Sequence, residues 1–380
     1  LAERFLASGR VEGLNGFNGA RVVVQGFGQL TGPGRITVTD SNKKTREIQA
    51  KNIVLATGSE AKMLPGLKSD AQTILTNKEI LSLKKIPKSM IVIGSGAVGV
   101  EFGSIFHRFG TEVTIIEMLP RVVPLEDEEV SAQLEKSLKK QKMAVHTQAK
   151  VEKVSKTGKG VTVEFTDAQG KAHKLEAETC LVAVGRAPNT QNIGLEKTRV
   201  RLERGFIKVD PYMRTDEPGV YAIGDIVAGS PLLAHVGSME GIVAVTHAAG
   251  KPAEPINYRQ VPNCTYCEPE IASVGLTERQ ARESGYNVKV GKFPFAGNSK
   301  AAILGSQEGF VKIVSDERYG EILGVHMIGP RVTEMIAEAV AVMRLEGTVE
   351  DLEHTIHPHP TLTEAVPEAA HAVHGMAIHI

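Results

Sequence analysis

Apolar and polar positions alternate in short runs over the first part of the chain. The runs Arg21–Gln25 and Arg35–Thr39 are rich in β-branched residues and are separated by glycine and proline, which is typical of antiparallel strands. A further strand is predicted over Ile48–Leu55. A capping box at Thr76 then predicts a short helix that ends near Leu83. We therefore expect a small strand meander followed by a connection to a second domain.

The first residues have the pattern of an interrupted element. Residues Leu1–Leu6 resemble the end of a helix whose beginning is absent, and they lack the basic, apolar and small-residue regions of a secretory signal. We expect the sequence to be part of a longer chain.

The middle of the chain has the pattern of a strand–helix–strand unit. Met90–Ile93 is a continuous apolar run that predicts a buried strand, and a glycine-rich turn and a helix through Phe109 follow it. A second strand is predicted over Glu112–Ile116, which completes the βαβ unit of α/β folds. The amphipathic run Glu128–Lys142 predicts the next covering helix. Antiparallel segments are expected before the buried strand Cys180–Val184.

Strands and helices are mixed toward the C-terminus. A helix rich in alanine and glycine is predicted from about Leu232 to Ala249, and prolines then mark a domain boundary. The strands Phe310–Val314 and Gly324–Ile328 precede a helix over Arg331–Leu345 with one continuous apolar face. This face leads us to expect a twofold homodimer through the C-terminal domain.

The composition narrows the classes of function. The 380 residues are enough for two or three domains, and 44 basic against 44 acidic residues remove the charge expected of a nucleic-acid binder. The chain has no apolar run near the roughly 18 residues that span a membrane. Three cysteines are too few for a disulfide scaffold and favour a reducing compartment. We expect a location in the bacterial cytoplasm or the mitochondrial matrix, with no nucleic-acid or membrane partner.

The glycine-rich turn predicts a dinucleotide site. Gly94, Gly96 and Gly99 follow a buried strand and open a helix, and Glu117 ends the next strand. The glycines allow a pyrophosphate to approach the backbone at the helix N-terminus, and an acid at the second strand accepts hydrogen bonds from the adenosine ribose. Because a carboxylate repels a 2′-phosphate, the motif favours NAD over NADP. The alternative is a glycine-rich turn with an incidental acid.

A second acid follows a later strand. The predicted strand near Val220 ends in Gly224 and Asp225, just before a helix. A carboxylate at the C-terminal end of a strand is well placed for a ligand hydroxyl. By spacing alone, a helix N-cap is an equal alternative.

Histidines gather near the C-terminus. His354, His357 and His359 lie within six residues, which raises the question of a metal site. The intervening prolines hold the segment extended and exclude the helical pairing of a zinc site, so no metal is predicted. A structural histidine is one alternative, and an oriented general base is the other, because Glu364 follows His359 by five residues.

A Cys-x-x-Cys pair is the remaining chemical motif. By spacing alone Cys264 and Cys267 fit a redox pair or half a zinc site. Flanking prolines predict an extended segment, and no second pair is present in the sequence, so we expect no redox or metal function here.

These motifs together resemble the pyridine nucleotide-disulfide oxidoreductases. The resemblance rests on Ala56-Thr57-Gly58, on the segment from Thr215 to Asp225, and on the run from His357 to Ala365, which is similar to members that oxidise dihydrolipoamide. It covers essentially the whole chain. The implied fold is α/β, with Rossmann-like FAD- and NAD(P)-binding domains and a C-terminal α+β dimerisation domain. The implied boundaries are 1–75 for the remainder of the FAD-binding domain, 76–195 for the NAD-binding domain, 196–258 for a central FAD-binding return segment and 259–380 for the interface domain.

The resemblance also implies roles for individual residues. His359 is implied as the base for a thiol and Glu364 as its partner, whereas His357 is implied as structural. Glu101 is similar to an acid that pairs with a lysine beside the flavin. The residues implied for FAD are Gly28, Thr57, Gly58, Ser59, Asp225, Leu232, Leu233, Ala234 and His235. Those implied for NAD are Gly94, Gly96, Gly99, Glu101, Glu117, Val151 and Gly185.

The implied activity is the oxidation of dihydrolipoamide by NAD⁺ through FAD and a redox disulfide. The implied partners are a second copy of the chain and the lipoyl domain of a 2-oxo-acid dehydrogenase complex or of the glycine cleavage system. The family also opens with an FAD-binding glycine motif and a Cys-x4-Cys disulfide, which this sequence does not contain, so we expect these residues alone to be inactive. The alternatives are a non-catalytic NAD-binding homodimer and another flavoprotein disulfide reductase.

Overall fold

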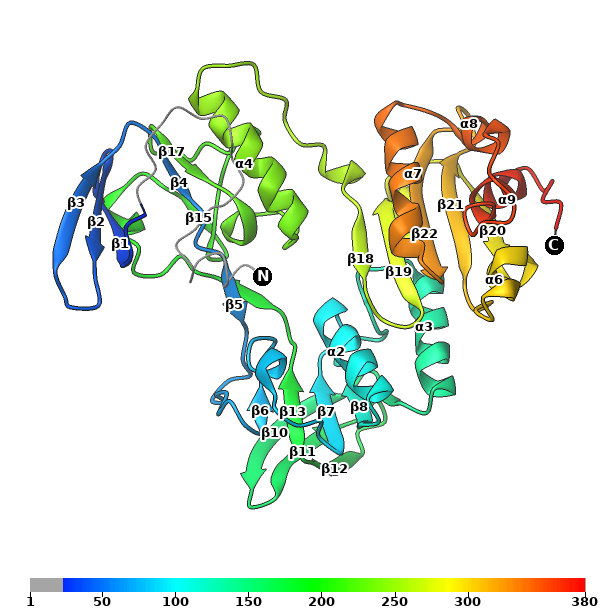
Figure 1. Ribbon diagram of the computed structural model, residues 1–380, viewed down its shortest axis with the longest axis horizontal. Coiled ribbons are helices and arrows are strands. Elements are labelled where there is room, and N and C mark those ends of the chain that lie inside the picture. Colours follow the sequence, from blue (N-terminus) through cyan, green and yellow to red (C-terminus); the bar gives the residue numbers. More distant parts are fainter. Residues whose placement is uncertain (1–22, 380) are drawn as a thin grey trace. The chain divides into compact units, whose positions relative to one another are not determined.

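The computed structural model describes residues 23–379 (Figure 1). Of these, 23–59 and 188–256 form the first unit, whereas 60–187 and 257–379 form the second unit. The chain crosses between the units at the paired strands β5 (Ser59–Ala61) and β14 (Arg186–Pro188). The predicted helix end at Leu1–Leu6 lies outside the described residues. Within residues 23–379, no helix combines the length and the apolar character that crossing a membrane requires.

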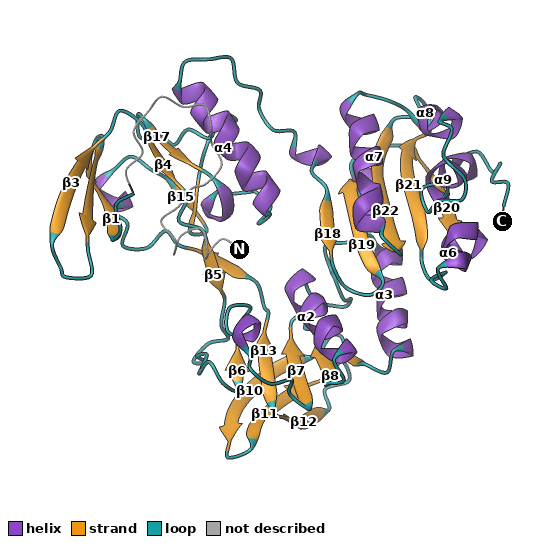
Figure 2. Cartoon of the chain, viewed as in Figure 1, coloured by secondary structure: helices purple, strands orange, loops and turns teal. Residues whose placement is uncertain are grey.

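The first unit combines a strand meander with a small parallel sheet (Figure 2). The meander is antiparallel in the order β1-β2-β3, and β4 pairs in parallel with β17. The elements are β1 (Phe27–Gly32), β2 (Arg35–Thr39), β3 (Thr45–Gln49), β4 (Ile53–Leu55), η2 (Leu195–Lys197), β15 (Leu202–Glu203), β16 (Phe206–Ile207), β17 (Val220–Ala222), η3 (Gly224–Ile226) and α4 (Ala234–Ala248).

Two strand predictions in this unit are wrong. The described part of Arg21–Gln25 is not a strand, and β1 begins only at Phe27. The single strand predicted over Ile48–Leu55 is two strands in different sheets, because the Ala50 N–H bonds to the meander while the Ile53 N–H bonds to Gly219 beside β17. The predicted strand Arg35–Thr39 is confirmed.

Residues 60–187, the parallel-sheet domain, contain the predicted βαβ unit. The parallel strand order is β6-β13-β7-β8-β9. Helices α2 and α3 pack on one face through a core that includes Val100 and Leu134, and the antiparallel sheet β10-β11-β12 packs on the other face through Val163 and Phe165. The elements are β6 (Ile74–Leu75), η1 (Ile80–Ser82), β7 (Ser89–Ile93), α2 (Ala97–Arg108), β8 (Glu112–Ile116), α3 (Glu128–Lys140), β9 (Ala144–His146), β10 (Lys150–Thr157), β11 (Gly160–Thr166), β12 (Ala172–Ala177) and β13 (Thr179–Val182).

Most predictions for the parallel-sheet domain are confirmed, including the strand Glu112–Ile116. The helix expected at Thr76 is only the 3₁₀ turn η1. The Glu79 carboxylate accepts hydrogen bonds from the backbone and hydroxyl of Thr76, but the helix does not propagate past Ser82.

Residues 257–379, the antiparallel-sheet domain, form a sheet in the order β18-β19-β22-β21-β20, with α7 packed along β19 and β22 (Figure 1). Helices α8 and α9, which the sequence patterns did not predict, complete this domain. The elements are η4 (Tyr258–Gln260), β18 (Asn263–Thr265), β19 (Glu270–Gly275), α5 (Glu278–Glu283), β20 (Val288–Pro294), η5 (Phe295–Gly297), α6 (Ser299–Ile303), β21 (Phe310–Asp316), β22 (Ile322–Gly329), α7 (Val332–Arg344), α8 (Val349–His354) and α9 (Ala365–Val373).

The apolar face of α7 packs inside its own domain. Val332, Met335, Ile336 and Ala339 are buried in the core of their own domain, together with Met327 and other residues of the sheet. Because the chain's own sheet covers this face, the face itself does not support the predicted homodimer.

Candidate active site

The glycine-rich turn leaves the backbone open at the start of α2. Gly94 has φ +96°, and a Cβ there would lie 2.4 Å from the Ala183 carbonyl oxygen. A Cβ at Gly99 would lie 1.9 Å from the Gly94 carbonyl oxygen, so a side chain does not fit at either position. Gly96, which has no side chain, precedes the helix and leaves its first N–H groups uncovered. Such a helix N-terminus attracts a pyrophosphate through its N–H groups and its dipole.

Glu117 lies directly after β8 and is fixed beside this turn. Its Oε2 accepts hydrogen bonds from the Ser95 N–H at 2.7 Å and from the Ser95 hydroxyl at 2.8 Å. Its Oε1 accepts the Leu119 N–H at 2.7 Å, and the residue is only 7% exposed. Carboxylate oxygens have further lone pairs, so this group can still accept a ribose hydroxyl. The sequence pattern did not point to Ser95, because the positions between the glycines of the motif can hold many residue types.

The remaining residues implied for NAD are Val151, Gly185 and Glu101, and they lie in different parts of the second unit. Val151 is in β10 and packs against the face of the parallel sheet that lies opposite α2. Gly185 follows β13, and its carbonyl accepts the Lys62 N–H at 2.9 Å. Glu101 is in α2, and its Oε1 accepts the Tyr266 N–H at 2.9 Å. Burial raises the pKa of Glu101, an effect that this hydrogen bond only partly offsets.

The first unit brings the segment Ala56-Thr57-Gly58 together with Asp225. Because β4 and β17 are parallel neighbours, the segments that follow them meet at one edge of the sheet. The Ser59 hydroxyl donates to Asp225 Oδ2 at 2.5 Å, and the Thr57 hydroxyl donates to the Asn189 carbonyl at 2.7 Å. The Gly58 carbonyl accepts the Asn189 N–H at 2.9 Å.

Asp225 does not have the capping role that its spacing allowed. The helices that follow β17 are η3 and α4, and their N-cap residues are Ile223 and Leu233. The N-cap alternative for Asp225 is therefore wrong. Leu232 and Leu233 precede α4, and Ala234 and His235 begin it.

One predicted FAD residue lies elsewhere in the first unit, and one buried acid near Asp225 was not predicted. Gly28 lies in a different sheet from Asp225, within β1 and opposite Val38. Glu240 of α4 was not predicted, although its side chain is fully buried and accepts hydrogen bonds from the Gly224 N–H and the Ser230 hydroxyl. A buried acid in a helix gave no sequence signal because its partners are distant backbone and hydroxyl groups.

His359 and Glu364 form a direct pair in the antiparallel-sheet domain. The His359 Nδ1 atom lies 2.9 Å from Glu364 Oε1, and Glu364 Oε2 accepts the Thr361 N–H at 2.8 Å. Burial alone would raise the pKa of Glu364, but the Thr361 N–H and His359 outweigh it and hold that pKa below its ordinary value. The His359 side chain is 71% exposed, so the ring edge opposite Glu364 is open to a substrate.

His357 and His354 have other partners. His357 Nε2 lies 2.6 Å from Glu338 Oε1, and its Nδ1 bonds to the Thr355 carbonyl at 2.8 Å. Its side chain is only 7% exposed, which fits the structural role predicted for it. His354 Nδ1 bonds to the Glu350 carbonyl. Among residues 23–379, no group of three histidine, cysteine or acidic side chains has an arrangement that could hold a metal ion.

The three cysteines are free thiols with suppressed ionisation. Burial raises the pKa of Cys180 to about 12 and that of Cys264 to about 11. Burial also raises the pKa of Cys267, whose Sγ lies 3.1 Å from the Pro269 carbonyl oxygen. A thiolate is the reactive form of cysteine, so these side chains are poor nucleophiles at neutral pH.

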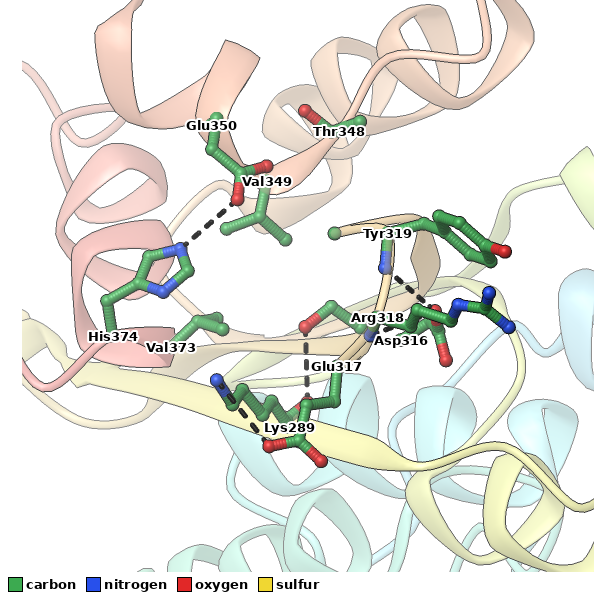
Figure 3. Close-up of a pocket in the computed structure, with 12 residues that line it drawn as sticks. Lys289, Asp316, Glu317, Arg318, Tyr319, Thr348, Val349, Glu350, Val373 and His374 are labelled. Atoms are coloured by element: carbon green, nitrogen blue, oxygen red, sulfur yellow. Dashed lines mark hydrogen bonds and ion pairs between the residues drawn. The ribbon is translucent and has the colours of Figure 1, made fainter.

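A separate hollow of about 530 Å³ lies on the antiparallel-sheet domain (Figure 3). Its walls come from β20, the turn between β21 and β22, α8 and α9. Its charged groups pair with one another, as in Lys289 with Glu317 at 3.7 Å and His374 with Glu350 at 3.5 Å. None of the predicted site residues lines it.

Comparisons with known proteins cover nearly the whole chain. Residues 12–241 match the pyridine nucleotide-disulphide oxidoreductase family, and residues 261–370 match the pyridine nucleotide-disulphide oxidoreductase dimerisation domain. The dihydrolipoyl dehydrogenase of Zymomonas mobilis is 44% identical over 358 residues, which cover 94% of this chain and 77% of that protein. The dihydrolipoyl dehydrogenase of Thermus scotoductus is 46% identical over 360 residues, which cover 94% of this chain and 76% of that protein.

Solved structures give the same grouping. LpdA from Mycobacterium tuberculosis superposes with a TM-score of 0.83 at 31% identity, over 91% of this chain and 76% of that one. The HOCl-induced flavoprotein disulfide reductase RclA from Escherichia coli superposes with a TM-score of 0.81 at 26% identity, over 91% of this chain and 78% of that one.

Proposed function

Because the chain belongs to the pyridine nucleotide-disulphide oxidoreductases, we propose that it oxidises dihydrolipoyl groups with NAD⁺ in the manner of its dihydrolipoyl dehydrogenase relatives. The predicted fold class and the predicted oxidoreductase class are confirmed by the same matches. The family uses FAD and NAD, as predicted.

The observation that best supports this activity is the pairing of His359 with Glu364. With Nδ1 held at 2.9 Å from Glu364, the opposite ring nitrogen Nε2 is the one that meets a substrate thiol. It accepts the thiol proton and leaves a thiolate, the nucleophilic form. The Glu364 carboxylate stabilises the imidazolium so formed and keeps the ring oriented.

The described residues fit the two cofactors. The turn at Gly94 and Gly99 excludes side chains where a pyrophosphate approaches, and Glu117 is held where the adenosine ribose is expected. Asp225, fixed by Ser59 at the edge of the parallel strands, is positioned for the ribitol hydroxyls of FAD. When bound, FAD passes the two electrons of the thiols on and NAD⁺ accepts them as a hydride.

The partners follow from the same family. The match of residues 261–370 to the dimerisation domain supports a homodimer. The names of the relatives support a lipoyl group as substrate, carried by the lipoyl domain of a 2-oxo-acid dehydrogenase complex or of the glycine cleavage system. The relatives quoted are bacterial proteins, which supports the bacterial cytoplasm as the location.

A steady-state assay of the full-length protein tests the activity. Dihydrolipoamide and NAD⁺ are mixed with the flavin-containing enzyme, and NADH formation is followed by absorbance. We expect turnover with NAD⁺, and faster turnover when the lipoyl group is attached to its protein domain. Reduction of glutathione disulfide by NADPH without dihydrolipoamide oxidation would instead identify another disulfide reductase.

A further inference from the structure

Lys312 of β21 is a buried lysine that joins the two domains of the second unit. The residue is 1% exposed. Its Nζ lies 3.0 Å from Asp127 Oδ1, 2.8 Å from Glu129 Oε2 and 2.8 Å from Glu278 Oε2. Asp127 and Glu129 are at the start of α3 in the parallel-sheet domain, whereas Lys312 and Glu278 are in the antiparallel-sheet domain. Burial alone would lower the pKa of Lys312, but the carboxylates outweigh it and hold that pKa above its ordinary value.

Lys312, Asp127, Glu129 and Glu278 form the Lys312 cluster. Neighbouring basic side chains balance its excess of negative charge. Lys292 bonds to Glu129 from the solvent side, and Arg282 bonds to Glu278 at 2.9 Å. His326 is opposite Lys312 on β22 and bonds to the Leu276 carbonyl, and burial lowers its pKa. Removal of one partner from such a buried ion pair leaves an uncompensated charge, so the loss of Lys312 would disturb the carboxylates around it.

Asp127 transmits this geometry to the segment that precedes α3. Asp127 is the N-cap of α3, and its Oδ1 accepts the Glu129 N–H at 3.1 Å. Its Oδ2 also accepts the Glu278 N–H at 3.3 Å, which adds a second link to the antiparallel-sheet domain. The adjacent Glu126 bonds through Oε1 to the Asn263 amide at 2.7 Å. Residues 118–126 form the connecting loop, which leads into α3. The bonds of Asp127 and Glu126 therefore fix the C-terminal end of this loop to the antiparallel-sheet domain.

The connecting loop reaches the glycine-rich turn. The Val123 N–H donates to the Ser95 carbonyl at 2.9 Å, and the Glu126 N–H donates to the Val123 carbonyl at 2.9 Å. Ser95 in turn bonds to the Glu117 carboxylate through both its N–H and its hydroxyl. A continuous series of bonds thus leads from Lys312 to the residue expected to bind the ribose.

We propose that Lys312 is a positioning residue for the dinucleotide site, which holds Asp127 and the connecting loop so that Ser95 and Glu117 keep the geometry that binds NAD⁺. This inference rests on the proposed NAD-dependent function. It assigns to the antiparallel-sheet domain a part in coenzyme binding that is separate from the His359–Glu364 pair.

The test compares Lys312→Met with Lys292→Met in the full-length protein. Lys292 also bonds to Glu129, but its side chain is 44% exposed and it does not contact Asp127 in the described structure, so it is a matched control. NAD⁺ binding is measured by calorimetry and the KM for NAD⁺ and kcat by steady-state kinetics. We expect Lys312→Met to weaken NAD⁺ binding and raise KM roughly tenfold, the effect of losing about one hydrogen bond between the ribose and the Glu117 carboxylate. We expect kcat to remain near the wild-type value, and Lys292→Met to behave like the wild type.

A second variant covers the case in which Lys312→Met does not fold. Asp127→Asn keeps an N-cap of equal quality but removes the charge that Lys312 holds, and it should weaken NAD⁺ binding in the same direction. Folded Lys312→Met or Asp127→Asn protein with wild-type NAD⁺ affinity overturns the inference, as does an equal loss in Lys292→Met. If the wild-type protein itself does not bind NAD⁺, the proposed function fails instead.

Discussion

The Nδ1 atom of His359 lies 2.9 Å from Oε1 of Glu364, and the second oxygen of that carboxylate is fixed by the Thr361 N–H at 2.8 Å. Each oxygen of the Glu364 carboxylate therefore already has a hydrogen-bond partner, one in the His359 ring and one in the backbone. The ring is exposed, but its orientation is set by a carboxylate that the loop itself holds in place.

Glu364→Gln should lower the rate of dihydrolipoamide oxidation by less than the loss of the imidazole does. The amide oxygen can still accept the Thr361 N–H, but it no longer stabilises an imidazolium, so we expect a loss of at most about 10²-fold, the lower end of general-base effects. The steady-state rate at saturating dihydrolipoamide measures this loss. Glu350→Gln removes the carboxylate that faces His374 at 3.5 Å and is the matched control, with a rate near the wild-type value. Equal losses in both variants would contradict the role of Glu364.

Glu117→Gln should reduce the preference for NAD⁺ over NADP⁺. The amide oxygen can keep the bonds from Ser95, whereas the amide NH2 group cannot accept the Leu119 N–H, and the negative charge that repels a 2′-phosphate is lost. Calorimetric titration of the full-length protein with both coenzymes measures the ratio of the two dissociation constants. Glu112→Gln, at the exposed start of the same strand, is the control and should leave the ratio unchanged. Tighter binding of NADP⁺ than NAD⁺ by the wild-type protein would show that the ribose assignment is wrong.

The linear order of residues predicted the nucleotide turn because the strand, glycines, helix and acid follow one another within 28 residues, from Met90 to Glu117. Lys312 could not be predicted in this way, since it meets Asp127 across 185 positions and a lysine within a strand normally indicates an exposed face. The same limit applies to α7, where the 3.6-residue period identified an apolar face but not the sheet that covers it. The strand predicted over Ile48–Leu55 failed because hydrogen-bond partners, rather than propensity, decide where a chain leaves one sheet for another.

Cys180, Cys264 and Cys267 should react slowly with iodoacetamide at neutral pH while the protein is folded. Burial raises the pKa of Cys180 to about 12 and that of Cys264 to about 11, and it also raises the pKa of Cys267, so little thiolate is present. Mass spectrometry of the peptides that contain these residues measures the labelled fraction, and the same protein in denaturant is the control that should label fully. Rapid labelling of Cys264 in the folded protein would contradict this expectation and would support a redox role for this cysteine.

The Lys312 cluster should make stability depend on pH in the acid range. For Asp127, burial alone would raise the pKa, but the nearby His326 and Lys312 together outweigh it, and the pKa is below its ordinary value. For Glu278, the hydrogen bond from Lys312 is the main cause of a lowered pKa. A carboxyl whose pKa is lower in the folded state stabilises the fold above its ordinary pKa of about 4, and this stabilisation is lost as the pH falls through the folded value.

Urea titrations between about pH 6 and pH 3 measure this loss, a range that includes the ordinary carboxyl pKa of about 4. We expect the unfolding midpoint to fall with pH in the wild-type protein and to fall less steeply in Lys312→Met, because the pKa values of Asp127 and Glu278 then return toward their ordinary values. Lys292→Met should retain most of the wild-type slope. An identical slope in the Lys312→Met protein would mean that the cluster does not set the acid response.

Stopped-flow measurement of the two half-reactions of the full-length enzyme tests the proposed function most directly. In one experiment dihydrolipoamide reduces the enzyme, and in the other NADH reduces the bound flavin. If His359 is the base for the substrate thiol, His359→Ala should slow the first half-reaction by roughly 10² to 10⁴ and leave the second nearly unchanged. His374→Ala, which removes another histidine–carboxylate pair of the same domain, should leave both unchanged. Equal slowing of both half-reactions by His359→Ala, or a wild-type thiol half-reaction without His359, would contradict the proposed mechanism.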